Sequence, residues 1–259
     1  MYILYHIIVC ALMTRTMMSC PTMCSCSKNW IVDCQYKSLT HVPVDIPKDT
    51  TRLILNGNNI RRIEENSLKG LKSLLVLEFS QNPLTMFKLT SSDTPMLRTL
   101  YLNNNTMLSS VIIMLPSLLF LYLDNTPTKC LWSNHVFAPN LSQLSMYNSS
   151  IRSLDITGYR WLWYLNIKGN SDFTILYSST SLRTLGRPRY VDVDANAVNC
   201  SCCMLQLLQK TRGKTIQKPI MGCRRYSQNQ NMQCADDNEV LSCSRSTLSV
   251  CSPGKTNDI

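Results

Sequence analysis

A leucine-rich spacing recurs through the middle of this chain. The pattern is L-x-x-L-x-L-x-x-N-x-L, which characterises repeat proteins with a period of about 20–29 residues. Clear copies begin at Leu74, Leu97, Leu118 and Leu141. One such repeat cannot bury its apolar edge alone, so neighbouring repeats stack into a solenoid with an extended exposed binding surface. The spacing therefore predicts an elongated repeat array rather than a compact globule.

Seven units can be counted if the second apolar position of each copy is taken as a marker. The markers are Leu53, Leu77, Leu100, Leu121, Leu144, Leu165 and Val191, at steps of 21 to 26 residues. In each short strand we expect the marker to point inward and its two neighbours to point outward, because successive strand side chains alternate between faces. Met107 is expected to supply the inward apolar residue that closes the third unit.

An asparagine follows most of these strands at a fixed position. The residues are Asn58, Asn82, Asn105, Asn170 and Asn196. We expect each amide to turn inward and to bond backbone groups that the bend would otherwise leave without partners. Thr126 and Ser149 occupy this position in two units, where we expect a weaker polar ladder.

Cysteines cluster on both sides of the repeats. Cys20-Pro21-x-x-Cys24-x-Cys26 and Cys34 precede the first unit. A second group, Cys200, Cys202, Cys223 and Cys243, follows the last unit. Because a solenoid exposes its core at both ends, terminal segments must cover it. We interpret the two clusters as caps.

The repeats and the amino-terminal cysteine motif resemble extracellular leucine-rich repeat proteins with cysteine caps at both ends. Toll-like receptor ectodomains, Slit, the Nogo receptor, platelet glycoprotein Ib and lamprey variable lymphocyte receptors are such proteins. The resemblance covers about residues 20 to 245. It implies an α/β repeat solenoid, a horseshoe with short parallel strands on its concave face and disulfide-bonded caps at both ends. It also implies four disulfides: Cys20–Cys26, Cys24–Cys34, Cys200–Cys223 and Cys202–Cys243.

Four further cysteines have no place in this scheme: Cys130, Cys203, Cys234 and Cys251. A Cys203–Cys234 bridge is one option. Cys130 could be buried, free, or paired with Cys251 or with a second chain. Zinc is disfavoured, because no histidine lies near a cysteine cluster and paired Cys-x2-Cys or Cys/His sets are missing. We expect no metal and no other cofactor.

The amino-terminal residues favour the secretory pathway. Ile3 to Met13 form an apolar run that is too short to span a bilayer but suits a signal peptide. The expected organisation is a signal peptide (1–19), an amino-terminal cap (20–49), repeats (50–198), a carboxy-terminal cap (199–251) and a polar tail (252–259). Disulfides persist in oxidising compartments, so the product is expected outside the cell, secreted or at the cell surface. No second apolar stretch is long enough to cross a membrane.

Asn-x-Ser/Thr triplets mark candidate glycosylation sites at Asn104, Asn140 and Asn148. A fourth triplet at Asn199 adjoins a cap cysteine. Asn104 and Asn148 follow their strands at the same repeat position. Glycans there would shield one edge of the concave face.

The net charge of +10 is concentrated near the carboxy-terminal cap. Between Arg183 and Arg225 there are nine Lys or Arg residues and two Asp residues. Candidate polyanion-binding residues are Arg187, Arg189, Lys210, Arg212, Lys214 and Lys218. They could attract heparan sulfate, or they could simply form a solvated surface. Nucleic acid is not an expected partner of an extracellular chain.

Outward-facing strand positions carry many aromatic residues: Tyr101, Phe120, Tyr122, Tyr147, Tyr164 and Tyr190. Exposed aromatic side chains among polar ones are typical of protein interfaces. The alternative is that the rings merely pack on one another across neighbouring strands.

We find no recognisable catalytic motif. The chain is therefore predicted to be a non-enzymatic recognition module that binds a protein or glycoprotein through its concave face. The resemblance to Toll-like receptors implies a soluble or truncated innate immune receptor. The alternative is an adhesion, matrix or guidance protein that binds heparan sulfate through its basic cap.

Overall fold

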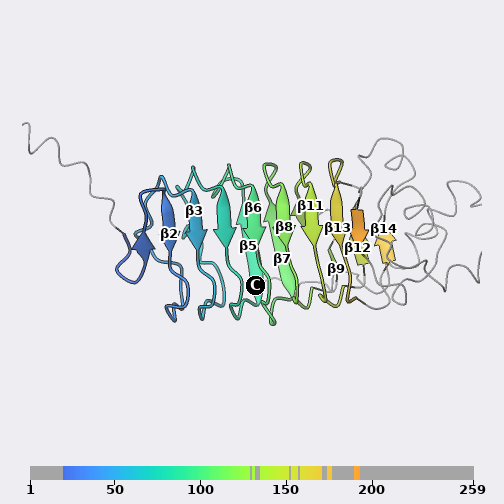
Figure 1. Cartoon of the computed structure of the whole chain (residues 1–259), viewed down its shortest axis with the longest axis horizontal. Helices are drawn as coiled ribbons and strands as arrows, with labels where there is room; N and C mark the ends of the chain where they lie inside the picture. The colour runs from blue at the N-terminus through green and yellow to red at the C-terminus, as the bar shows by residue number, and fades with distance from the viewer. Residues whose placement is uncertain are drawn as a thin grey trace, which may run out of the picture.

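The computed structural model describes residues 20–128, 130–131, 135–151, 153–156, 158–170, 174–176 and 190–192. In these residues the chain winds into a stack of coils, and every assigned element is a strand (Figure 1). One strand from each coil joins the nine-stranded main sheet. Its members in order are β1 (Ser25–Cys26), β2 (Ile31–Asp33), β3 (Arg52–Ile54), β4 (Val76–Glu78), β6 (Thr99–Tyr101), β8 (Phe120–Tyr122), β11 (Gln143–Ser145), β13 (Tyr164–Asn166) and β15 (Tyr190–Asp192).

The strand register confirms the repeat phase predicted from sequence. Strands β2 to β15 of this sheet are parallel, and the seven marker residues lie opposite one another from Leu53 to Val191. Val32 of the amino-terminal cap extends the same row, because it pairs with Leu53. The cap strand thus acts as an additional rung that covers the first repeat. Strand β1 pairs antiparallel to β2 and ends the sheet.

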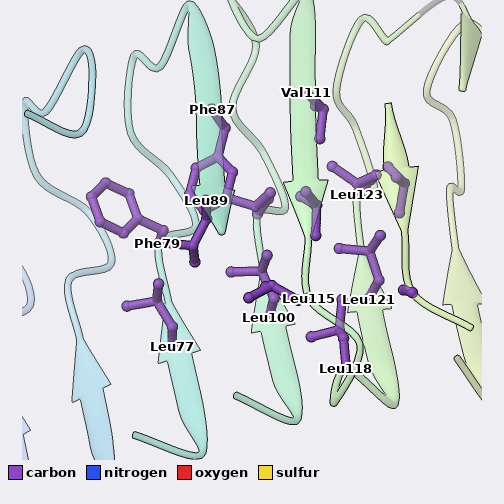
Figure 2. Packing of buried hydrophobic residues seen from close by; sticks show 14 of the residues in the cluster. Leu77, Phe79, Phe87, Leu89, Leu100, Val111, Leu115, Leu118, Leu121 and Leu123 are labelled. Atoms are coloured by element: carbon purple, nitrogen blue, oxygen red, sulfur yellow. The ribbon is translucent and has the colours of Figure 1, made fainter. Parts of the chain in front are cut away.

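The core lies between the main sheet and the opposite side of each coil (Figure 2). All seven markers are buried, with the apolar residue two positions later buried in the first six units. Met107 is an exception to the sequence prediction, since its side chain is exposed and Leu108 is buried instead. A tight turn in which the Leu108 amide donates to the Asn105 carbonyl shifts the inward position by one residue.

The four described consensus asparagines point inward and join neighbouring coils. Asn105, for example, is fully buried, and its Nδ2 donates to the Phe79 carbonyl of the preceding coil and the Leu102 carbonyl of its own coil. Its Oδ1 accepts from the Asn82 amide. Thr126 donates only to Leu123 of its own coil, and Ser149 reaches back to the same carbonyl. The side-chain ladder therefore contains fewer hydrogen bonds at these two coils than at Asn105, as the sequence predicts.

Two smaller parallel sheets, which the sequence analysis did not foresee, lie on the side opposite the main sheet. One contains β5 (Met86–Thr90), β7 (Ser110–Met114) and β10 (Val136–Phe137). The other contains β9 (Cys130–Leu131), β12 (Ser153–Asp155) and β14 (Thr174–Leu176). Alternate residues of β5 and β7 enter the core, and the Phe87 ring packs edge-on against Phe79 at 6.2 Å between centroids.

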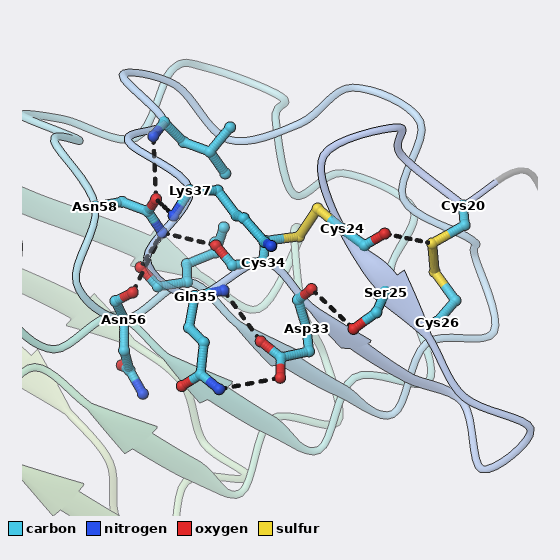
Figure 3. Close-up of a disulfide and its surroundings, with 12 residues drawn as sticks. Cys20, Cys24, Ser25, Cys26, Asp33, Cys34, Gln35, Lys37, Asn56 and Asn58 are labelled. Atoms are coloured by element: carbon cyan, nitrogen blue, oxygen red, sulfur yellow. Dashed lines mark hydrogen bonds between the residues drawn. A yellow bond between two sulfur atoms is a disulfide. The ribbon is translucent and has the colours of Figure 1, made fainter.

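The amino-terminal cap contains two disulfides, Cys20–Cys26 and Cys24–Cys34 (Figure 3). These are the two pairs that the resemblance implies. Cys34 is fully buried, and its carbonyl accepts a hydrogen bond from the Asn58 side chain. The cap is thus connected to the first repeat both by the sheet and by the asparagine ladder.

Several predicted features lie outside the described residues. These are the signal peptide, the cap cysteines from Cys200 to Cys243, Cys203, Cys234 and Cys251, together with Asn196 and Asn199. The proposed domain boundaries stay predictions. Within the part of the chain that the structure describes, we find no helix that is long and apolar enough to cross a membrane.

Candidate ligand-binding face

The outer surface of the main sheet, here called the concave face, presents three rows of side chains. The first row contains Arg52, Val76, Thr99, Phe120, Gln143, Tyr164 and Tyr190. The second row contains Ile54, Glu78, Tyr101, Tyr122, Ser145, Asn166 and Asp192. The third row, two residues further along each coil, contains Asn56, Ser80, Asn103, Asp124, Tyr147 and Lys168. All are half-buried or exposed except Ser145, which is buried.

The amino-terminal end of the concave face is internally paired. The Arg52 guanidinium forms an ion pair with Glu78, and Nε of Arg52 donates to Oε1 of Glu78 at 2.8 Å. The other carboxylate oxygen accepts from Nδ2 of Asn56 at 2.7 Å. With its charge neutralised inside the sheet, Glu78 has little capacity left for a ligand.

The third row forms a second polar ladder that the sequence analysis missed. Asn56 Oδ1 accepts from the Ser80 amide at 2.8 Å, and Asn103 Oδ1 accepts from the Asp124 amide at 2.8 Å. Asp124 Oδ1 accepts in turn from the Tyr147 amide at 2.7 Å. These side chains join each coil to the next, so they serve structure as well as surface. Their regular spacing along the repeats was the available sequence signal.

Two of the predicted aromatic residues, Tyr101 and Tyr122, stack on each other. Their ring centroids are 4.6 Å apart and their planes differ by 6°. Ring packing across strands therefore does occur at this pair, although both side chains stay half-exposed. Burial and the neighbouring Tyr101 and Asp124 raise the pKa of the Tyr122 phenol above its usual value.

Tyr164 has a different role, since its hydroxyl donates to Oδ2 of Asp192 at 2.6 Å. Partial burial raises the pKa of the Tyr164 phenol, and the hydrogen bond and negative charge of Asp192 raise it further. Asp124 contributes to the same increase. The phenol is therefore neutral at physiological pH and keeps its proton as a donor.

Trp163 enlarges the aromatic surface next to Tyr164, and Trp161 is a second exposed tryptophan shortly before it in the chain; the sequence predictions included neither. Each is exposed, while Leu162 between them is buried. The Trp163 ring packs edge-on against Tyr190, with 4.8 Å between centroids. The alternation Trp-Leu-Trp was the sequence signal for this exposure. Of the other predicted residues, Phe120 is half-buried in the first row and Tyr147 is exposed in the third.

Asn104 and Asn148, two of the predicted glycosylation sites, share one edge of the concave face with Asn125. All three are in the left-handed backbone region, which asparagine tolerates. The Asn125 side chain donates to Asn104 Oδ1 at 2.9 Å, and that of Asn148 donates to Asn125 Oδ1 at 2.9 Å. Asn104 and Asn148 are exposed, as is Asn140, whose Nδ2 donates to the Pro116 carbonyl. Each retains a side-chain N–H that could be exchanged for a sugar.

The candidate polyanion-binding residues, from Arg187 to Lys218, lie outside the described residues. Cys130 belongs to β9, where it is opposite Ser153 in the parallel pairing with β12. Among the described residues no group of three or more His, Cys, Asp or Glu side chains could hold a metal ion.

Comparisons with known proteins agree with this architecture. The leucine rich repeat family matches residues 49–107, and the leucine rich repeat N-terminal domain family matches residues 19–47. The platelet glycoprotein Ib beta chain of Mus musculus is 35% identical over 79 residues, which are 30% of this chain and 38% of that protein. Leucine-rich repeat-containing protein 3 of Danio rerio is 35% identical over 97 residues, covering 34% of this chain and 35% of the other.

Two more distant similarities cover more of the chain. Podocan of Mus musculus is 26% identical over 166 residues, 62% of this chain and 26% of podocan. The crystal structure of human 5T4 (Wnt-activated inhibitory factor 1, trophoblast glycoprotein) has a TM-score of 0.49 and 21% identity, and the match covers 78% of this chain and 89% of that one.

The chain spans between about a quarter and two fifths of the length of these curated relatives. The repeat register, the inward asparagines, the disulfides Cys20–Cys26 and Cys24–Cys34 and the two family matches all lead to the same assignment. Residues 19–107 of this chain thus match an amino-terminal cysteine cap followed by leucine-rich repeats, and the same strand register continues to β15.

Proposed function

We propose that the chain is an extracellular recognition module that binds a protein or glycoprotein through the aromatic part of its concave face. The observation that carries this proposal is the half-exposed aromatic group from β6 to β15, in which Tyr101, Tyr122 and Tyr164 are the central members. Tyrosine offers a large contact area with few rotamers to lose, which suits it to interface anchors. A solvent-facing strand position does not need an aromatic ring for stability.

An extracellular location is supported by the two cap disulfides, because such bonds persist in oxidising compartments. The predicted signal peptide and the exposed Asn104, Asn140 and Asn148 sequons agree with it. A leucine-rich repeat array is a recognition scaffold and not an enzyme, which agrees with the prediction of no catalytic activity.

The proposal is tested with the secreted mature chain and a variant in which Tyr101, Tyr122 and Tyr164 are changed to Ala. Partners are captured from intact cells by proximity labelling. The matched control changes Met86, Met96 and Met107 to Ala, because these exposed side chains lie away from the main sheet. We expect at least a fivefold loss of specific labelling for the tyrosine variant and none for the control. Equal labelling by both variants, with melting temperatures preserved, would contradict the concave-face assignment.

Within this proposal an innate immune receptor of the Toll-like kind is the first candidate. An adhesion, matrix or guidance protein that binds heparan sulfate is the alternative, supported by the basic segment from Arg183 to Arg225. Elution from immobilised heparin as a function of salt distinguishes the two. Steep salt dependence that is lost when Arg187, Arg189, Lys210 and Arg212 are changed to Gln supports the alternative.

A further inference from the structure

The part of the concave face from β8 to β15 contains a group of residues that we call the acidic tyrosine cluster: Tyr122, Asp124, Ser145, Tyr164 and Asp192. Ser145 has the smallest side chain among the described members of the second row, and it is the only buried one. It lies opposite Tyr122 on one side and Asn166 on the other. The Ser145 side chain therefore extends less far from the sheet than the larger side chains around it.

Each of the two carboxylates in this cluster uses only one of its oxygens. Asp124 Oδ1 accepts from Ser145 Oγ at 2.6 Å as well as from the Tyr147 amide. Asp192 Oδ2 accepts from the Tyr164 hydroxyl at 2.6 Å. No donor among the described residues bonds the second oxygen of either group, and the three ion pairs found there involve Glu64 and Glu78 instead. Within the described part of the chain, the negative charge of this cluster is thus balanced less completely than that of Glu78.

The electrostatic field of the two carboxylates converges on Tyr164. Both Asp192 and Asp124 raise the pKa of its phenol, although burial is the largest cause. Asp124 acts on Tyr122 in the same direction. Burial disfavours a charge of either sign, but the charges of Asp124 and Asp192 attract a positive group. Neither Lys168, at the end of the third row, nor Arg98, just before β6, forms an ion pair with these carboxylates.

The aromatic rings favour a planar cation. A planar guanidinium can stack on a tyrosine ring while it donates to a carboxylate through two parallel N–H bonds, which an ammonium group cannot do. Tyr122 and Tyr164 bring rings to the cluster, and Asp124 and Asp192 each bring a carboxylate oxygen that no described residue bonds. This combination complements arginine better than lysine.

We propose that the acidic tyrosine cluster receives an arginine side chain of the protein partner. This inference rests on the proposed function, because it names the chemistry that the same face recognises. With a net charge of +10, the chain as a whole repels cations, so any attraction for arginine is local to this cluster. An arginine accepted here must therefore be held by this cluster.

The experiment uses the mature chain with 13C-labelled tyrosine rings, titrated by NMR with N-acetylarginine N-methylamide. N-acetylcitrulline N-methylamide serves as the neutral probe of the same shape. The test variant is Asp124→Asn, which keeps an oxygen for the Ser145 and Tyr147 donors but removes the charge. The control variant is Asp49→Asn, which makes the same change at an exposed position of the amino-terminal cap.

We expect the arginine probe to shift the Tyr122 and Tyr164 ring signals in a saturable way, and the citrulline probe to bind at least fivefold more weakly. Asp124→Asn should weaken arginine binding about threefold or more, whereas Asp49→Asn should not change it. Equal shifts by both probes, or an unchanged affinity in Asp124→Asn, would overturn the inference.

The two experiments together distinguish failure of the arginine inference from failure of the proposed function. If arginine fails to bind while the triple tyrosine variant still loses its partner, the recognition face stands and its arginine specificity falls. If the chain sediments as a dimer and Asp124→Asn abolishes dimerisation, the arginine comes from a second copy, and the assignment to a separate partner is overturned.

Discussion

Asn105→Ala should destabilise the repeat array, because this side chain forms hydrogen bonds with three backbone groups. The amide donates to the carbonyls of Phe79 and Leu102, and its oxygen accepts from the Asn82 amide. Asn105 is fully buried, so water does not replace these bonds without opening the array. Each buried group left without a partner costs about 1–3 kcal/mol. The Phe79 carbonyl keeps a 3.3 Å bond from Nδ2 of Asn82, so two groups lose their partner. The expected loss in free energy of unfolding is therefore about 2 kcal/mol or more.

Urea unfolding followed by far-ultraviolet circular dichroism measures this loss. Since small proteins lose about 1–3 kcal/mol of stability per molar urea, the midpoint should fall by about 1 M or more. Asn105→Thr is the matched variant, because Thr126 shows that threonine at this position can still bond the carbonyl of its own coil. It should fall between the wild type and Asn105→Ala.

A midpoint for Asn105→Ala within about 0.3 M of wild type, at an unchanged urea dependence, would refute the reasoning. It would mean that the Leu102 carbonyl and the Asn82 amide find other partners, and that the inward asparagine is not what joins these coils. The Asn105→Thr result separates the contribution of the amide from that of side-chain volume.

Two further predictions follow from the backbone and from the phenols. Gly57→Ala should cost about 1–3 kcal/mol, because Gly57 has a φ of +66° and a Cβ there would lie 2.2 Å from the Tyr36 ring. Gly70→Ala, with a φ of +91° and nothing within 4 Å, isolates the backbone cost, and equal losses in urea unfolding would exclude a role for the ring. Because the folded pKa of Tyr164 is raised, its contribution to stability is present below the unfolded value of about 10 and is lost as pH rises through the folded value. In an absorbance titration, Tyr164→Phe should have one fewer phenol with a raised pKa than the wild type. An unchanged number of such phenols would contradict the assignment to Tyr164.

The sequence predicted the repeat phase correctly because the phase depends on local spacing. Marker residues such as Leu100 and Leu121 must point into the same core, so a single period determines both burial and register. The inward asparagines were predictable for the same reason. The prediction that Met107 is buried was wrong because a local turn shifts the inward position by one residue, and spacing alone does not reveal such a shift.

The chemistry of the site was harder to predict, because it depends on contacts between coils. The positions of Tyr101, Tyr122 and Tyr164 on the surface followed from alternation along each strand. Whether a ring stacks on its neighbour, as Tyr101 does, or bonds a carboxylate, as Tyr164 does, depends on side-chain directions that spacing does not specify. The strands opposite the main sheet were missed because the repeat pattern says little about that part of each coil.

Those opposite strands have a geometric consequence. A solenoid of this kind bends when its back is wider than its front, so that each coil forms a wedge. From β4 to β13, however, front and back both contain parallel strands, and hydrogen-bonded strands are about 4.8 Å apart wherever they occur. Coils of similar width on both sides stack with little curvature. The concave face is therefore shallow, and a partner that follows it needs an extended rather than a strongly convex surface.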